Sequence, residues 1–327
     1  MAVKVKSRLV SPDETRDLGF GSVVSGESRQ RLLNRDGSFN VARDGLSFWE
    51  SLNLYHSLLT MSWLKFLSFM TVFYIVVNAL FALAFLLCGE SALASPAGEV
   101  FGGNFRRAFF FSVHTFATIG YGNISPVGLA SNLIVTFEAL CGLLSVALLT
   151  GVIFARFSRP TANILFSEHA ILAPYRGITA FEFRLTNSRS SQIIELVANV
   201  LYARFEDSNG KMIRRFYSLA LERDKVTFFP LSWTIVHPID EQSPLFGLTQ
   251  EDLVKENAEF LVLLTGIDET FSQTVHARSS YKADEVVWNA RFADIYNRDS
   301  DTETLTIDVR RLDMIERMDS SLEPRQE

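Results

Sequence analysis

The amino-acid sequence predicts an α-helical membrane domain with two spans, joined to an all-β sandwich domain. Two apolar stretches, residues 63–87 and about 132–157, are each long enough to cross about 30 Å of hydrocarbon as a helix, and both contain few charges. Beyond Ser167 the pattern changes to short β-rich runs separated by turn residues, which is typical of a β-sandwich. The mean hydropathy of +0.15 also favours a membrane protein.

The bulk composition limits the classes of function. A chain of 327 residues suits two domains, and a net charge of −6 argues against nucleic acid as a partner. The two cysteines have no metal-ligand spacing and the five histidines are scattered, so we expect no cofactor. Because the sequence also lacks a nucleophile elbow and a phosphate-binding loop, we predict that the chain is not an enzyme.

The N-terminal part is predicted to contain a tail and an interfacial helix. Residues 1–43 mix charged residues with Ser, Gly and Asn, which indicates a loosely ordered tail without a signal peptide. Residues 44–60 have an amphipathic pattern with Trp49 and Tyr55, which suits a helix lying at a membrane surface, although an ordinary surface helix has the same pattern.

Residues 61–160 are predicted to form the membrane domain. A helix over about 105–117, capped by Asn104, would lie between the two spans and is too short to cross a bilayer. Lys65 at the start of the first span and Arg156 at the end of the second would lie at the same membrane face. This matches the positive-inside rule with both termini cytoplasmic.

The segment after the short helix carries the chemistry. A dehydrated potassium ion needs a stack of backbone carbonyl oxygens, which an almost linear chain with alternating left- and right-handed dihedrals can supply. Gly120 and Gly122 tolerate such dihedrals. Thr118 would add its hydroxyl, while Ile119 and Tyr121 would face away from the ion and pack against the short helix. Residues 118–122 are therefore predicted to be a selectivity filter, with K⁺ as the permeant ion.

The position of this segment agrees with that prediction. It lies between two membrane spans, as a re-entrant loop requires. The negative end of the helix at 105–117 would point toward the ion cavity. Four such loops are needed to surround an ion, so we expect a homotetramer.

Residues 161–310 are predicted to form the sandwich, and residues 311–327 a polar tail. The expected strands are 179–185, 193–205, 213–221, 260–265, 274–280 and 285–296.

Several motifs resemble one family. The matching segments are Leu54-Tyr55-His56, Ala155-Arg156-Phe157-Ser158-Arg159-Pro160, Ser232-Trp233-Thr234, His237-Pro238-Ile239-Asp240-Glu241, Ser243-Pro244-Leu245, and Ala277-Arg278-Ser279-Ser280-Tyr281 with Glu285 and Trp288. Together they make residues 44–300 similar to prokaryotic inward-rectifier (KirBac) potassium channels. The extracellular cysteine pair of animal members is missing.

This resemblance implies an immunoglobulin-like cytoplasmic domain that extends the ion path, with a constriction in the loop 266–273. That loop comprises Gly266, Ile267, Asp268, Glu269, Thr270, Phe271, Ser272 and Gln273. Phe154 matches the bulky residue of a gate where the inner helices cross. Gly142 matches a hinge within that helix, but close helix packing would equally require a glycine.

The rectification position of the family corresponds to Val146, which carries no charge. Block by Mg²⁺ or polyamines is an implied property of the family, but strong rectification is not expected here. Glu138 is an acid within the second span, and an intramembrane carboxylate is costly unless it faces water or a partner. It could border the cavity under the filter or brace the short helix from behind, and we favour the first.

Two residues beside the filter depart from the family pattern. His114 replaces a Glu or Gln, either as a neutral hydrogen-bonding substitute, which we favour, or as a pH-sensitive group. Asn123 stands where many potassium channels have an acid. These departures keep a weakly selective cation channel open as an alternative function.

We expect a multi-pass protein of the bacterial inner membrane that binds copies of itself. Lys65, Arg156 and Arg159 could contact anionic lipid head groups, or could only set the topology. A membrane-anchored binding module, with the sandwich as its functional part, is a further alternative, although it leaves residues 118–122 unexplained.

Overall fold

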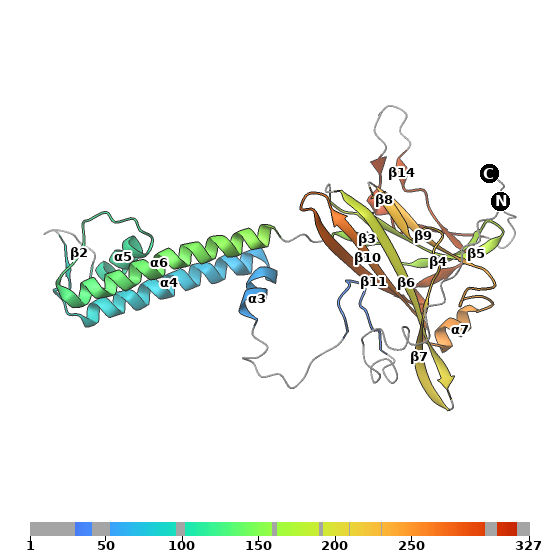
Figure 1. The fold of residues 1–327 in the computed structure, drawn as a ribbon, viewed down its shortest axis with the longest axis horizontal. Helices are drawn as coiled ribbons and strands as arrows, with labels where there is room; N and C mark the ends of the chain where they lie inside the picture. Colours follow the sequence, from blue (N-terminus) through green and yellow to red (C-terminus); the bar gives the residue numbers. More distant parts are fainter. Residues whose placement is uncertain are drawn as a thin grey trace. The chain divides into compact units, whose positions relative to one another are not determined.

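The computed structural model describes residues 30–40, 53–95, 102–158, 162–189, 192–208, 210–229, 231–297 and 306–318. Most of the expected tails, residues 44–52 of the interfacial helix, and Arg159 lie outside the described residues. The chain divides into two compact units, one of Asp44–Arg159 and one of Met1–Arg43 with Pro160–Glu327. Figure 1 shows the elements of both.

Within its described residues, the membrane unit contains four helices and one short β-pair. Its elements are α3 (Leu54–Thr60), α4 (Trp63–Leu87), β1 (Leu93–Ala94), α5 (Asn104–Phe116), β2 (Ser125–Pro126) and α6 (Gly128–Phe157). In Figure 1, α4 and α6 run side by side, with α5 and the β-pair at one end of the pair and α3 at the other. Both α4 and α6 are long and apolar enough to cross a membrane, and most of their side chains are exposed in the single chain.

The second span begins four residues earlier than the sequence suggested. Asn132 marked the expected start, but it lies inside α6, where its Nδ2 donates to the carbonyl of Gly128 at 2.7 Å. Asn104 does not cap α5 either. It is the first helical residue, and its Nδ2 donates to Glu90 at 3.2 Å. Neither side chain therefore caps a helix by accepting a hydrogen bond from a backbone amide of the first turn.

The second unit is a sandwich of two sheets, as predicted. One sheet has the order β11-β10-β6-β7 with β8 beside β6, and the other has the order β12-β4-β5-β3 with β9 beside β5. The strands are β3 (Ile164–Phe166), β4 (Ala170–Tyr175), β5 (Ile178–Asn187), β6 (Ile193–Ser208), β7 (Lys211–Ser218), β8 (Lys225–Phe229), β9 (Ser232–Ile239), β10 (Glu259–Asp268), β11 (Gln273–Lys282) and β12 (Val286–Trp288). One short helix, α7 (Gln250–Lys255), precedes β10.

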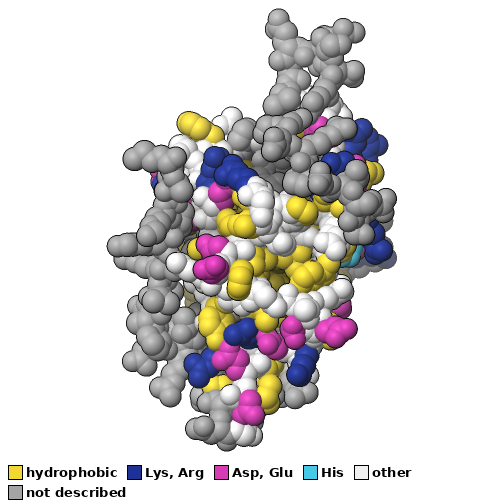
Figure 2. Space-filling model, turned by 90° about the vertical axis from the view of Figure 1, so that its right-hand side faces the viewer, with side chains coloured by type: hydrophobic (Ala, Val, Ile, Leu, Met, Phe, Trp, Pro, Cys, Tyr) yellow, Lys and Arg dark blue, Asp and Glu magenta, His cyan; other side chains and the backbone are white. Residues whose placement is uncertain are grey.

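The apolar core lies between the two sheets and is rich in aromatic rings. Phe260 of β10 stacks on Phe181 of β5, with ring centroids 4.1 Å apart, and also contacts Tyr202 of β6 at 5.2 Å. All three side chains are buried. Figure 2 shows one outer face of this unit, where hydrophobic side chains are interspersed with acidic and basic ones.

Residues 30–40 are packed onto the sandwich, although the sequence indicated a loose tail. Leu32 and Leu33 are buried against Phe216 and Leu261, and the Glu259 carboxylate accepts hydrogen bonds from both of their backbone amides at 3.0–3.2 Å. Burial raises the pKa of Glu259, and these amides offset part of that shift. Arg31 also forms an ion pair with Glu285, in which Nη1 and Oε1 are 2.9 Å apart. The sequence could not show this because the partners lie more than 180 residues away.

The C-terminal part also contains short strands that pair with each other. These are β13 (Ala290–Phe292) with β16 (Ile315–Arg317), and β14 (Tyr296–Asn297) with β15 (Thr306–Ile307). The strand β16 lies within residues 311–327, which were expected to be a polar tail. Its Ile315 instead packs against the buried cluster that contains Ile171 and Ala290.

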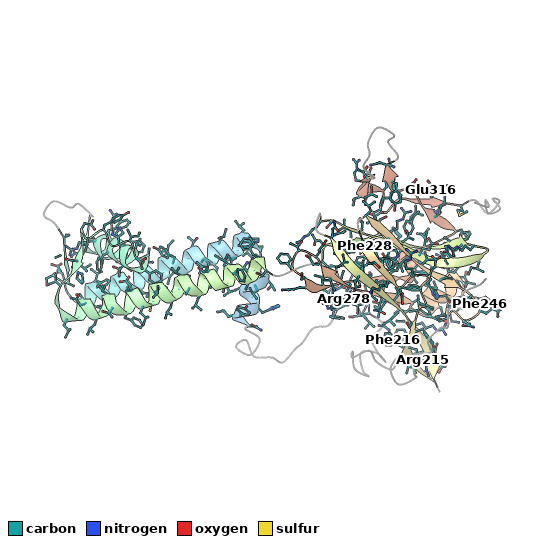
Figure 3. The ribbon with its side chains drawn as sticks, turned by 45° about the horizontal axis from the view of Figure 1, so that its top comes forward. Arg215, Phe216, Phe228, Phe246, Arg278 and Glu316 are labelled. Carbon is teal, nitrogen blue, oxygen red and sulfur yellow. The ribbon has the colours of Figure 1, made fainter. Side chains whose placement is uncertain are left out.

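Replacing Phe260 by Ala should destabilise the sandwich by about 3–5 kcal/mol, because it removes a buried ring that contacts two others. The matched control is Phe246→Ala, since Phe246 is 56% exposed and lies at the periphery in Figure 3. Thermal unfolding of the detergent-solubilised full chain measures both. Equal unfolding temperatures for the two variants would contradict the assigned core.

Candidate functional site

The C-terminal end of α5 holds the start of the predicted filter loop. The backbone amides of Ile119 and Gly120 both donate to the carbonyl of His114, at 2.8 and 3.2 Å, and the amide of Thr118 donates to Thr115 at 3.0 Å. These bonds turn the chain back at the end of the helix. The loop position is therefore set directly by the position of α5.

The backbone of the loop alternates in handedness. Thr118, Gly120 and Gly122 have φ values of +56°, +59° and +78°, whereas Ile119 and Tyr121 between them have none in the left-handed region. Such alternation turns successive carbonyls toward one side of the chain. Because Thr118 is not glycine, its left-handed conformation costs free energy that the surrounding hydrogen bonds must offset. The loop thus presents a row of carbonyl oxygens that can bind a bare cation.

Two side chains of the loop, those of Ile119 and Tyr121, are exposed in the single chain. Tyr121 places its ring edge-on to the ring of His114, with centroids 4.9 Å apart, yet it remains 72% exposed. Ile119 is also exposed in the single chain. His114 and Asn123 are both half-buried. The outer side of the loop is therefore free to contact further protein.

Three buried polar side chains join the helices behind the loop. Asn78 of α4, Ser112 of α5 and Glu138 of α6 are each fully buried. Ser112 Oγ lies 3.0 Å from Asn78 Oδ1 and within hydrogen-bond distance of Glu138 Oε1. Of the two placements considered for Glu138, the structure therefore has the second: its carboxyl group braces α5 and does not border an open cavity.

Asn78 and Ser112 were not identified from the sequence. Asn78 carries the one amide side chain between Trp63 and Leu87, and a lone amide in a membrane span requires a hydrogen-bond partner. The sequence therefore indicated that Asn78 needs a partner, but it did not indicate that the partner is Ser112.

Gly142 of α6 lies against the backbone of Phe116 at the end of α5. A Cβ atom there would lie 2.3 Å from the carbonyl oxygen of Phe116, and α6 continues through this position as one helix. The contact favours close packing as the reason for glycine. Val146 and Phe154, further along α6, are both exposed in the single chain.

Arg156 is held by the protein near the other end of α6. Its guanidinium lies 4.6 Å from the ring centroids of both Trp63 and Phe66, and it donates to the carbonyl oxygens of Leu58 and Met61. These contacts connect α6 to α3 and α4. Two nitrogens of the Arg156 guanidinium therefore donate within the protein, whereas Lys65 is exposed.

The predicted constriction, residues 266–273, forms the hairpin between β10 and β11. The buried Asp268 carboxylate accepts hydrogen bonds from the amides of Thr270 and Phe271, at 2.9 and 3.3 Å. These bonds fix the turn, and Phe271 at its tip is exposed.

Comparison with known proteins covers both units. The ion channel family matches residues 51–159, and the C-terminal domain family of inward rectifier potassium channels matches residues 164–327. The inward rectifier potassium channel Kirbac3.1 of Paramagnetospirillum magnetotacticum is 46% identical over 278 residues, which is 84% of this chain and 92% of that protein. The human inward rectifier potassium channel 18 is 28% identical over 87% of this chain and 71% of its own length. All are channels, in agreement with the prediction that the chain is not an enzyme.

Gly142→Ala should lower the stability of the membrane unit by about 1–3 kcal/mol, because the added methyl group overlaps the Phe116 carbonyl. Gly151→Ala is a matched control in the same helix, where a Cβ atom meets nothing within 4 Å. It should be neutral or slightly stabilising, since Ala favours helix over Gly. Thermal unfolding in detergent distinguishes the two variants. Equal unfolding temperatures would contradict a tight contact between Gly142 and Phe116.

Proposed function

Because the chain belongs to the inward rectifier potassium channel family, we propose that four copies assemble into a membrane channel that conducts K⁺ passively through a filter formed by residues 118–122. The observation that carries this proposal is the alternating backbone of Thr118, Gly120 and Gly122 at the end of α5. No other segment among the described residues combines such a backbone with a position between two membrane spans.

The filter would replace the water shell of the ion with protein oxygens. Backbone carbonyls of the loop and the hydroxyl of Thr118 are the ligands, and four loops around one axis complete the coordination. The carbonyl end of α5 faces the same region and stabilises a cation there. A single chain supplies one quarter of such a site, which agrees with the open side of the loop.

The gate is proposed at the cytoplasmic end of α6. Phe154 is 72% exposed in the single chain, and four such rings around the axis would close the path by excluding water. Arg156, two residues further on, links this end of α6 to α3 and α4. Movement of α3 would therefore be transmitted to the gate. The hairpin at 266–273 would form a second constriction.

Rectification is proposed to be weak. Val146 offers no charge to hold Mg²⁺ or a polyamine, and Glu138 is buried against α5. Both termini are proposed to be cytoplasmic, from the placement of Lys65 and Arg156. Of Lys65 and Arg156, the two described residues proposed to contact anionic lipid, Lys65 has the more exposed side chain.

A weakly selective cation channel is the second candidate function. His114 and Asn123 flank the filter where the family pattern has other residues, and His114 also contacts Tyr121 of the filter. The ratio of potassium to sodium permeability separates the two candidates.

Purified protein in potassium-loaded liposomes should take up rubidium, with block by barium and no replacement by sodium. The matched control is Gly120→Ala, since an L-residue at φ +59° costs about 1–2 kcal/mol and disturbs the carbonyl row. This variant should lose uptake. Equal uptake of sodium would favour the weakly selective channel, and no uptake with or without anionic lipid would contradict a conducting filter.

Phe154→Ala should increase the open probability, because the smaller side chain cannot exclude water at the crossing of the helices. Single-channel recording in lipid bilayers measures this directly. Leu148→Ala is the control, as an exposed apolar residue elsewhere on α6. An unchanged open probability for Phe154→Ala would place the gate elsewhere.

A further inference from the structure

The contacts of Ser112 raise a question of proton counting. Its hydroxyl oxygen lies within hydrogen-bond distance of two oxygens, Asn78 Oδ1 at 3.0 Å and Glu138 Oε1. A serine hydroxyl carries one proton. If that proton is given to one of these oxygens, the other contact needs a proton from the partner. An ionised Glu138 and a carbonyl oxygen of Asn78 cannot supply one.

The orientation of the Asn78 amide is fixed by the α4 backbone. Its Nδ2 donates to the carbonyl oxygen of Tyr74 at 2.8 Å. Exchanging the amide nitrogen and oxygen would place two acceptors, Asn78 Oδ1 and the Tyr74 carbonyl oxygen, against each other at that distance. The oxygen of Asn78 must therefore face Ser112 and accept its proton. The remaining contact, between Ser112 and Glu138, then requires a proton on the glutamate.

We infer that Glu138 is a neutral carboxylic acid that donates its proton to Ser112. A one-way chain of hydrogen bonds then runs from Glu138 through Ser112 and Asn78 to the backbone of α4. Every step has one donor and one acceptor.

The surroundings of Glu138 agree with a neutral acid. The side chain is fully buried in an apolar helix, and among the described residues Oε2 has no hydrogen-bond partner. An ionised carboxylate in such a place would lose its hydration without compensation. A protonated acid leaves one weak acceptor unpaired, which costs far less.

Glu138 is thereby a positioning residue for the filter, and this role rests on the proposed function. Ser112 lies two residues before His114, whose carbonyl holds the amides of Ile119 and Gly120. The chain of hydrogen bonds sets α5 against both spanning helices and so sets the start of the filter loop. Because the acid is neutral, it adds no negative charge for a blocking cation.

Infrared spectroscopy tests the protonation directly. Full-length protein in liposomes at neutral pH should show the C=O stretching band of a protonated carboxylic acid, and this band should disappear in Glu138→Gln. Most other carboxyl groups of the chain are ionised at this pH and absorb elsewhere. No band lost on substitution would mean that Glu138 is ionised, which would overturn the inference.

Conduction tests the role of the proton donor. Glu138→Gln presents an amide N–H to Ser112 and should keep rubidium uptake within about twofold of the wild type, whereas Glu138→Leu should lower it by about tenfold or more. Loss of uptake in both variants, with wild-type uptake intact, would contradict the inference. If the wild type itself takes up no rubidium but the infrared band is present, the proposed function fails while the neutral acid stands.

Discussion

The hydroxyl of Ser112 joins α4, α5 and α6, and the candidate site depends on that junction. In the proposed filter the carbonyls of residues 118–122 would face an ion, so they would not be available to hold the loop in place. The loop is instead anchored through the carbonyl of His114 at the end of α5. Since α5 does not cross the membrane, its own position comes from its contacts with α4 and α6. A buried hydrogen-bond chain at Ser112 and a backbone contact at Gly142 provide them on one side of the helix.

The use of polar atoms and a glycine for this purpose follows from the membrane. Lipid tails are as apolar as leucine side chains, so burying more leucine does not drive one spanning helix against another. Close packing and hydrogen bonds must do so. In the sandwich, where water is the solvent, the stacked rings of Phe181, Tyr202 and Phe260 are sufficient. The two units therefore have different kinds of core, and a substitution that one would tolerate can be costly in the other.

The same difference explains what the sequence could predict. Apolar stretches and the pattern at residues 118–122 depend on neighbouring residues, so the two spans, the short helix and the loop were predictable, with errors of a few residues at their ends. Contacts between distant residues were not. The place of Glu138 depends on Ser112, 26 residues earlier, and the packing of residues 30–40 depends on Glu259. Strands such as β4, which contains Pro174, lack the alternation of a half-exposed strand because most of their side chains are buried.

The packing of residues 30–40 also brings together two parts of the chain that flank the membrane unit in the sequence. Arg35 donates a hydrogen bond to the carbonyl of Ser167 at 3.1 Å. Residues 35–37 and residues 162–166 also line one cavity, together with Arg278. Residues 35–37, which precede α3 in the sequence, and residues 162–167, which follow α6, therefore lie beside each other on the sandwich. Within the membrane unit, Arg156 joins the ends of these same two helices. Displacement of α6 alone would break the contacts of Arg156 with Leu58, Met61 and the ring of Trp63, so α3 and α6 should move together at the proposed gate.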